Sequence, residues 1–149
     1  MVGSDLESRS EMRLITLVIG ILGLAAMYLF KGELFYDPWE DFVPQLLAPY
    51  PDIDNTWLYI GGKYLRFFIN DVCMFLIVYT LFPLSSTMRL GIIVFLFGAL
   101  LLLPVYLILA LNPGDFTVHY IPHLHRITMN PLLMLLLIPA IYLQRRRLL

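Results

Sequence analysis

Residues 57–82 read WLYIGGKYLRFFINDVCMFLIVYTLF, a segment long and apolar enough to cross a membrane as one helix although it contains ionisable groups. Inserting an ionisable side chain at membrane depth costs about 2.5 to 3.5 kcal/mol, and such groups persist mainly where a partner satisfies them. Arg66, Asn70 and Asp71 lie in the middle of this segment. They are therefore the first candidates for a functional site.

The composition is that of a membrane protein. Sixty per cent of the residues are apolar and 14% are charged, whereas about a quarter of the residues in a soluble domain are charged. The chain has no basic surface that would bind nucleic acid. Cys73 is its only cysteine, which excludes an intrachain disulfide and a cysteine-based metal site. We expect Cys73 to be a buried small hydrophobic side chain.

Four apolar segments approach the roughly 20 helical residues that cross a hydrocarbon core. They cover about residues 12–30, 57–82, 90–111 and 125–143. The first has no small-residue cleavage site after it, so we interpret it as an uncleaved span. The last should begin near His123 or Arg126 and bend at Pro131. Pro139 in the same span and Pro104 in the third span are further positions at which a helix can bend. The prediction is an all-α polytopic protein, one membrane domain over residues 1–149 with four transmembrane helices.

The positions of Lys and Arg predict the orientation. Arginines flank the first span, stand in the connector after the second and follow the last, and by the positive-inside rule these places are cytoplasmic. Both termini should then be cytoplasmic in a bacterial inner membrane, with outer loops at 31–56 and 112–124. These arginines are Arg9, Arg13, Arg89, Arg145, Arg146 and Arg147.

The first outer loop should contain a short interfacial helix. Asp37 can cap it, Pro38 suits its first position and Glu40 completes a capping box. Trp39 and Phe42 then share an apolar face suited to the headgroup layer. The loop is either a lid that anchors itself in the interface or a platform that binds a substrate or partner.

Helical geometry separates the polar residues of the second span. At 100° per residue, Arg66 and Asn70 share a face, while Asp71 points roughly 140° away from Arg66. Asp71 must therefore find its partner on another helix, in water or by protonation. If Gly61 and Gly62 break the helix, Lys63 and Arg66 instead extend toward the interface. An anchoring role, a contact with a protein or lipid, and catalysis or ion transfer all remain open.

A second polar group, HYIPHLHR, lies in the other outer loop and at the start of the last span. His119, His123 and His125 have a spacing found among metal ligands, but Pro122 interrupts them and no metalloprotease motif is present. Interfacial histidines, with Arg126 anchoring the last span, are the simpler interpretation. A sharper hypothesis brings Arg66, Asp71 and His125 or Arg126 together in one polar pocket at the outer face.

Three segments carry a resemblance to a known family: LFYDP at 34–38, RFFIN at 66–70 and HRITMNPLLMLLLIPAIYLQ at 125–144. They resemble the landmarks of the exosortase F system-associated protein family, small multi-pass membrane proteins of Bacteroidetes. The resemblance extends over residues 34–144, and His125 and Asn130 depart from the family pattern. It implies an inner-membrane accessory protein associated with an envelope protein-sorting system.

The expected function is therefore that of a small accessory subunit, without cofactor, that binds membrane lipids and larger membrane proteins. Gly20, Gly23, Gly91 and Gly98 would allow close approach between helices. One alternative is a membrane-embedded enzyme that depends on a thiol or a metal, although a reactive thiol needs a base or cation near Cys73. Another is a component of an oligomeric channel or transporter, although the chain shows no internal repeat.

Overall fold

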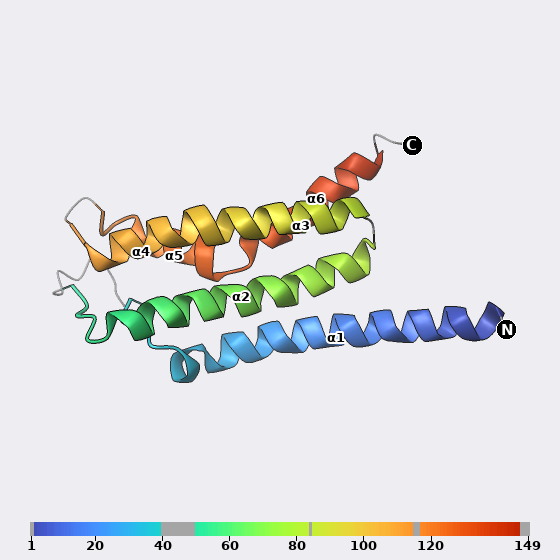
Figure 1. Cartoon of the computed structure of the whole chain (residues 1–149), viewed down its shortest axis with the longest axis horizontal. Coiled ribbons are helices and arrows are strands. Elements are labelled where there is room, and N and C mark those ends of the chain that lie inside the picture. Colours follow the sequence, from blue (N-terminus) through green and yellow to red (C-terminus); the bar gives the residue numbers. More distant parts are fainter. Residues whose placement is uncertain (1, 40–49, 84, 115–116, 147–149) are drawn as a thin grey trace.

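The regular secondary structure of the chain is helical throughout the residues that the structure, a computed structural model, describes: 2–39, 50–83, 85–114 and 117–146. Figure 1 shows an elongated bundle in which the start of α1 and the end of α6 lie at the same end. The all-α prediction is confirmed for these residues. The elements in chain order are α1 (Val2–Leu34), α2 (Thr56–Leu81), α3 (Ser85–Phe97), the π-helical turn η2 (Gly98–Leu102), α4 (Leu103–Leu111), α5 (Ile121–Met129) and α6 (Leu132–Arg146).

Three of these helices are long and apolar enough to cross a membrane by themselves. They are Ser10–Leu34 within α1, all of α2, and Thr87–Leu111, which runs through α3, η2 and α4. The pair α5 and α6 is a fourth candidate only if the two are taken as one span, because they meet at an angle of 59°. The bend expected at Pro131 is therefore present. The interfacial helix expected after Asp37 lies mostly outside the described residues, including Glu40 and Phe42.

Helix α2 is the centre of the bundle. The side chain of Asn55 caps its start by accepting a hydrogen bond of 3.0 Å from the amide of Leu58. The helix continues through Gly61 and Gly62 without a break. The alternative prediction, in which these two glycines interrupt the span, is therefore wrong. Each of the other α-helices contacts α2, whereas α1 packs mainly on α2 alone. In Figure 1, α1 accordingly lies along one side of the bundle.

The third span carries a local irregularity at its proline. Pro104 has no amide hydrogen, and its ring crowds the carbonyl of the residue four positions earlier. The helix accommodates this by widening into the π-helical turn η2 immediately before α4, which has Pro104 in its first turn. Such turns arise where the regular hydrogen-bond ladder is interrupted. The bending position predicted at Pro104 is therefore a π-turn.

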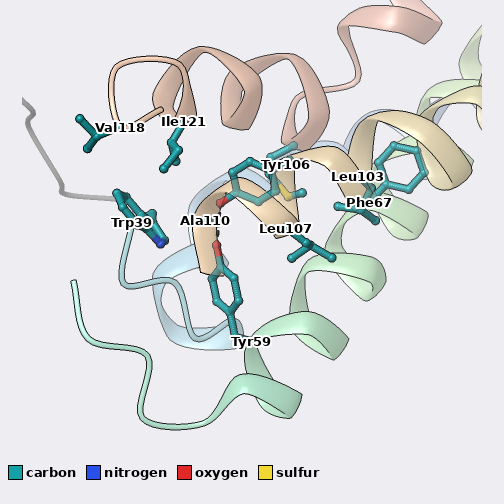
Figure 2. Close-up of a cluster of buried hydrophobic side chains, with 10 residues drawn as sticks. Trp39, Tyr59, Phe67, Leu103, Tyr106, Leu107, Ala110, Val118 and Ile121 are labelled. Carbon is teal, nitrogen blue, oxygen red and sulfur yellow. Dashed lines mark hydrogen bonds between the residues drawn. The ribbon is translucent and has the colours of Figure 1, made fainter. Parts of the chain in front are cut away.

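The buried side chains form two clusters along the bundle. One gathers around the ends of α2, α4 and α5 and includes Trp39, Tyr59, Tyr106 and Ile121, and Figure 2 shows these side chains converging from the loop after α1 and from the helices. The other joins α2 to α6 through Met74, Val78, Met134, Leu137 and Ile141. The first cluster surrounds the polar residues described below.

Three of the glycines that sequence analysis assigned to close helix approach lie at contacts between helices of the bundle. A Cβ atom at Gly98 would lie 2.6 Å from Cζ of Phe67, and one at Gly20 would lie 2.9 Å from the carbonyl oxygen of Cys73. Gly91 faces the ring of Phe75. These positions join α1, α3 and η2 to α2, so their small size stabilises the fold of the chain itself.

Candidate functional site

A buried carboxylate lies at the centre of the polar residues at the loop end of the bundle. Asp37, three residues after α1 ends, has a side chain that is only 2% exposed. Its Oδ2 accepts from Nζ of Lys63 and lies 3.0 Å from Nε2 of His125 and 3.3 Å from Nη1 of Arg66. Lys63 also lies within 3.2 Å of His125. We call Asp37, Lys63, Arg66 and His125 the Asp37 network.

This network joins three separate parts of the chain. Asp37 comes from the loop after α1, Lys63 and Arg66 lie one turn apart on α2, and His125 lies on α5. The spacing of three residues puts Lys63 and Arg66 on the same helical face, where both reach one carboxylate. Because the side chains of Lys63 and Arg66 are 2% and 7% exposed, removing the carboxylate would leave their charges in a poorly solvated environment.

The charge of Asp37 is stabilised by its neighbours. Burial by itself raises the pKa of the Asp37 carboxyl, but the hydrogen bond with His125 and the positive charge of Lys63 outweigh burial and lower this pKa to about 2. Asp37 is therefore ionised at neutral pH. Its other oxygen, Oδ1, is buried and has no hydrogen-bond partner in the structure.

Two tyrosines enclose the ammonium group of Lys63. The hydroxyls of Tyr59 on α2 and Tyr106 on α4 lie 2.8 Å apart, and Figure 2 shows the two side chains pointing toward each other. Nζ of Lys63 is 5.2 Å from the ring centre of Tyr59 and 5.5 Å from that of Tyr106, within the range of cation–π attraction. Both rings are fully buried, so they exclude water from the network.

The Asp37 network and the two tyrosines beside it include residues to which sequence analysis gave a different role or none. Asp37 was expected to cap an interfacial helix, but its carboxylate points into the bundle. Tyr59 and Tyr106 were not identified, and Lys63 was considered only as an interfacial anchor. The available signal was the shared helical face of Lys63 and Arg66, which requires an anionic partner when both are buried. The partner's position in a distant loop could not be read from that face.

Asn70 and Arg66 share a groove, as their common helical face predicts. The groove has a volume of about 270 Å³ and lies between α1, α2 and the α5–α6 junction. Its polar lining comes from Lys31, Arg66, Asn70 and Asn130, and the rest is largely apolar. Nδ2 of Asn70 also donates to the carbonyl oxygen of Met129 at 2.7 Å.

Asp71 faces a different pocket and does not join the Asp37 network. Its residue is 4% exposed, and Oδ2 is buried without a hydrogen-bond partner in the structure. The pocket of about 150 Å³ lies between α2, α3 and α6 and is otherwise apolar, with Phe68, Val72, Phe75, Gly91, Ile92, Phe95 and Met134 around the carboxyl. The predicted divergence of Asp71 from Arg66 is thus confirmed, whereas their convergence in one pocket is wrong.

The remaining candidates separate in space. His119, His123 and Arg126 are exposed, while His125 contacts Asp37. No group of three or more His, Cys, Asp or Glu side chains could hold a metal ion within the described ranges. Cys73 packs against α1, since its Sγ occupies the position next to Gly23 that a Cβ would fill. The thiol thus belongs to the α1–α2 contact.

Comparison with known proteins adds no relative: no family model matches the chain, and neither a curated protein nor a solved structure is similar to it.

Proposed function

We propose that the chain is a non-catalytic membrane subunit that binds a larger integral membrane protein, and that Asp71 forms part of the contact. The proposal rests on Oδ2 of Asp71, which has no hydrogen-bond partner in the structure and lies beside a pocket at the side of the bundle. Lining residues Phe68, Val72 and Ile92 are partly exposed, so this pocket opens laterally. A partner approaching in the membrane plane would meet it directly.

The depth of Asp71 distinguishes a protein partner from lipid. Asp71 lies 15 residues after Thr56, or about 22 Å along a helix of 26 residues, at 1.5 Å per residue. Acyl chains at that depth offer no hydrogen-bond donor. A transmembrane helix that presents Arg, Lys, His, Ser or Thr would satisfy the carboxyl, as polar side chains do between membrane helices.

The pocket size supports insertion of a side chain. Pockets for drug-sized molecules occupy roughly 300 to 1,000 Å³, whereas this one has about 150 Å³. That space suits the end of one donor side chain better than a substrate. The Asp37 network in turn supports a structural role, because Lys63, Arg66 and His125 already contact its carboxylate, and Asp37 lines neither of the two pockets described above.

The proposal extends to location and partner class. The start of α1 and the end of α6 lie at one end of the bundle (Figure 1), and the sequence has arginines near both chain ends. The positive-inside rule therefore supports a bacterial inner-membrane protein with cytoplasmic termini. The resemblance to exosortase F system-associated proteins supports a partner in an envelope protein-sorting system.

The test compares two variants that each remove a buried polar atom without a hydrogen-bond partner. Asp71→Leu removes the carboxyl, and Thr128→Val removes the orphaned Oγ1 of Thr128 on α5, away from the pocket. After gentle detergent extraction from the native membrane, we expect wild type and Thr128→Val to retain the same partner and Asp71→Leu to lose it. Asp71→Leu should remain monodisperse, since removing an unpaired buried polar group does not destabilise the isolated chain.

A photo-crosslinker at Val72 identifies what occupies the pocket. The expected product is an adduct to a transmembrane peptide of the co-purified protein. Adducts to lipid alone, or equal recovery of the complex with Asp71→Leu, would contradict the proposed contact.

A further inference from the structure

We propose that the groove lined by Lys31, Arg66, Asn70 and Asn130 binds a phosphate group, carried in the membrane by the headgroup of an acidic lipid. This site lies on another face of α2 from the Asp71 pocket. It is therefore independent of the contact with a protein partner.

Arg66 is the central residue of the groove. Among the described residues, its Nη1 donates to Oδ2 of Asp37 at 3.3 Å, which is long for a charge-assisted hydrogen bond. A guanidinium carries five N–H donors, and this one also lines the groove. Arg66 thus has donors to offer to an oxyanion while it remains attached to the Asp37 network.

The other polar residues complete a donor set around the same space. Lys31 in the last turn of α1 adds a second cation, and its Nζ lies 5.7 Å from the ring centre of Tyr28. Asn70 uses one amide hydrogen on Met129 and keeps a second. Asn130 is exposed, at the junction of α5 and α6. Two cations and two amides are chemistry that favours phosphate.

The negative charge of Asp37 does not prevent an anion from binding in this groove. Its carboxylate is absent from the groove lining, and Oδ2 contacts Lys63 and His125 as well as Arg66. Asp37 therefore divides its charge between Arg66 and two other groups and does not neutralise Arg66 alone.

The apolar lining indicates that the phosphate belongs to an amphiphile. Leu24, Met27 and Tyr28 of α1 form one wall, with Pro131 opposite. Tyr28 is 75% exposed, so the groove opens at the side of the bundle. The phosphate would lie at the Lys31 and Arg66 end of the groove, because Arg66 is five residues nearer the start of α2 than Asp71, and an acyl chain would continue from there beside α1.

The experiment measures lipid retention by the purified full chain in detergent. Phosphatidylglycerol, phosphatidylcholine and inorganic phosphate are added in separate arms, with native mass spectrometry and thermal unfolding as readouts. We expect phosphatidylglycerol to be retained and to raise the melting temperature, and phosphatidylcholine to do neither. Stabilisation by inorganic phosphate alone would support the same oxyanion site with a soluble ligand as its source.

Variants outside the Asp37 network test the position of the site. Lys31→Gln and Asn130→Leu should each weaken phosphatidylglycerol binding by roughly tenfold, as expected for loss of one such contact, when affinity is measured on variant protein that is folded and monodisperse without lipid. Arg89→Gln, which removes an exposed cation at the other end of the bundle, should bind like wild type. Equal retention of both lipids, or unchanged affinity in Lys31→Gln and Asn130→Leu, would overturn the proposal.

Discussion

Nδ2 of Asn70 donates a 2.7 Å hydrogen bond to the carbonyl oxygen of Met129, the last residue of α5. A helix end leaves carbonyl groups without partners inside the helix, and the 59° bend between α5 and α6 creates such an end within the fourth candidate span. In a bilayer core an unsatisfied carbonyl costs several kcal/mol. Asn70 therefore makes the broken span compatible with a membrane.

The first prediction concerns this hydrogen bond. Asn70→Leu should lower the free energy of unfolding in detergent by about 1 to 3 kcal/mol, because it leaves a buried carbonyl unsatisfied. Asn112→Leu is the matched control, since Asn112 donates to the carbonyl of Ile108 at 3.1 Å at an exposed helix end. Water replaces that bond, so the control should change stability by less than about 0.5 kcal/mol. Equal effects would show that burial of the Met129 carbonyl does not matter.

Removing the central carboxylate should destabilise the protein strongly. Asp37→Asn leaves Lys63 and Arg66 buried without their anion, and breaking a buried ion pair in this way costs about 3 to 5 kcal/mol. Lys63→Met removes one of the two cations at similar side-chain length. The double variant should lose less stability than the sum of the single losses. Strict additivity in equilibrium unfolding would mean that the pair is not coupled.

The stability of the folded chain should fall in acid through Asp37. The pKa of its carboxyl is lowered from 3.8 to about 2 on folding, so its contribution is fully present above about pH 4 and disappears as the pH falls toward 2. At 1.36 kcal/mol per pKa unit the loss is about 2 kcal/mol. Lys63, Arg66, His125, Tyr59 and Tyr106 face the same carboxylate or its partners.

The measurement is unfolding as a function of pH for wild type and Asp37→Asn. Subtracting the two profiles removes the groups whose titration does not depend on Asp37. The difference should shrink between pH 4 and 2. A difference that stays constant over this range would rule out Asp37 as the source.

The tyrosine pair predicts a non-additive effect. Tyr59→Phe or Tyr106→Phe leaves the other hydroxyl buried and unpaired, at a cost of about 1 to 3 kcal/mol. The double variant removes both hydroxyls and should be more stable than the sum of the two losses implies. Thermal unfolding of all four proteins closes the double-mutant cycle. A coupling energy near zero would contradict the hydrogen bond between Tyr59 and Tyr106.

Replacing two helical glycines by alanine should change the stability of the protein in opposite directions. A Cβ at Gly98 meets the buried ring of Phe67 at 2.6 Å, and overpacking of this kind costs about 1 to 3 kcal/mol. Nothing lies within 4 Å of the Cβ position at Gly61, so Gly61→Ala should stabilise the helix by about 0.5 to 1 kcal/mol. Unfolding of the two variants gives the sign directly. A stable Gly98→Ala protein would mean that α2 and η2 separate easily.

The sequence predicted features that depend on local geometry. Helical periodicity was enough to place Arg66 with Asn70 and to direct Asp71 elsewhere, and Pro131 was enough to predict the bend. The site itself depends on contacts between distant segments. Asp37 and His125 are 88 residues apart, and no local pattern links a loop aspartate to a histidine on another helix. The capping motif around Asp37 was a plausible local explanation that tertiary contacts replaced.

The position of Asp37 in the chain has a consequence for membrane insertion. The carboxylate is synthesised before Lys63 and Arg66, so it is present when α2 leaves the ribosome. Charges that pair within one helical hairpin enter the membrane at lower cost than isolated charges. We expect α1, the loop and α2 to insert as a unit, before His125 is made. Fusing a topology reporter after residue 83 would show this: Asp37→Leu should lower the fraction of correctly inserted α2, whereas His125→Leu in the full chain should leave it unchanged.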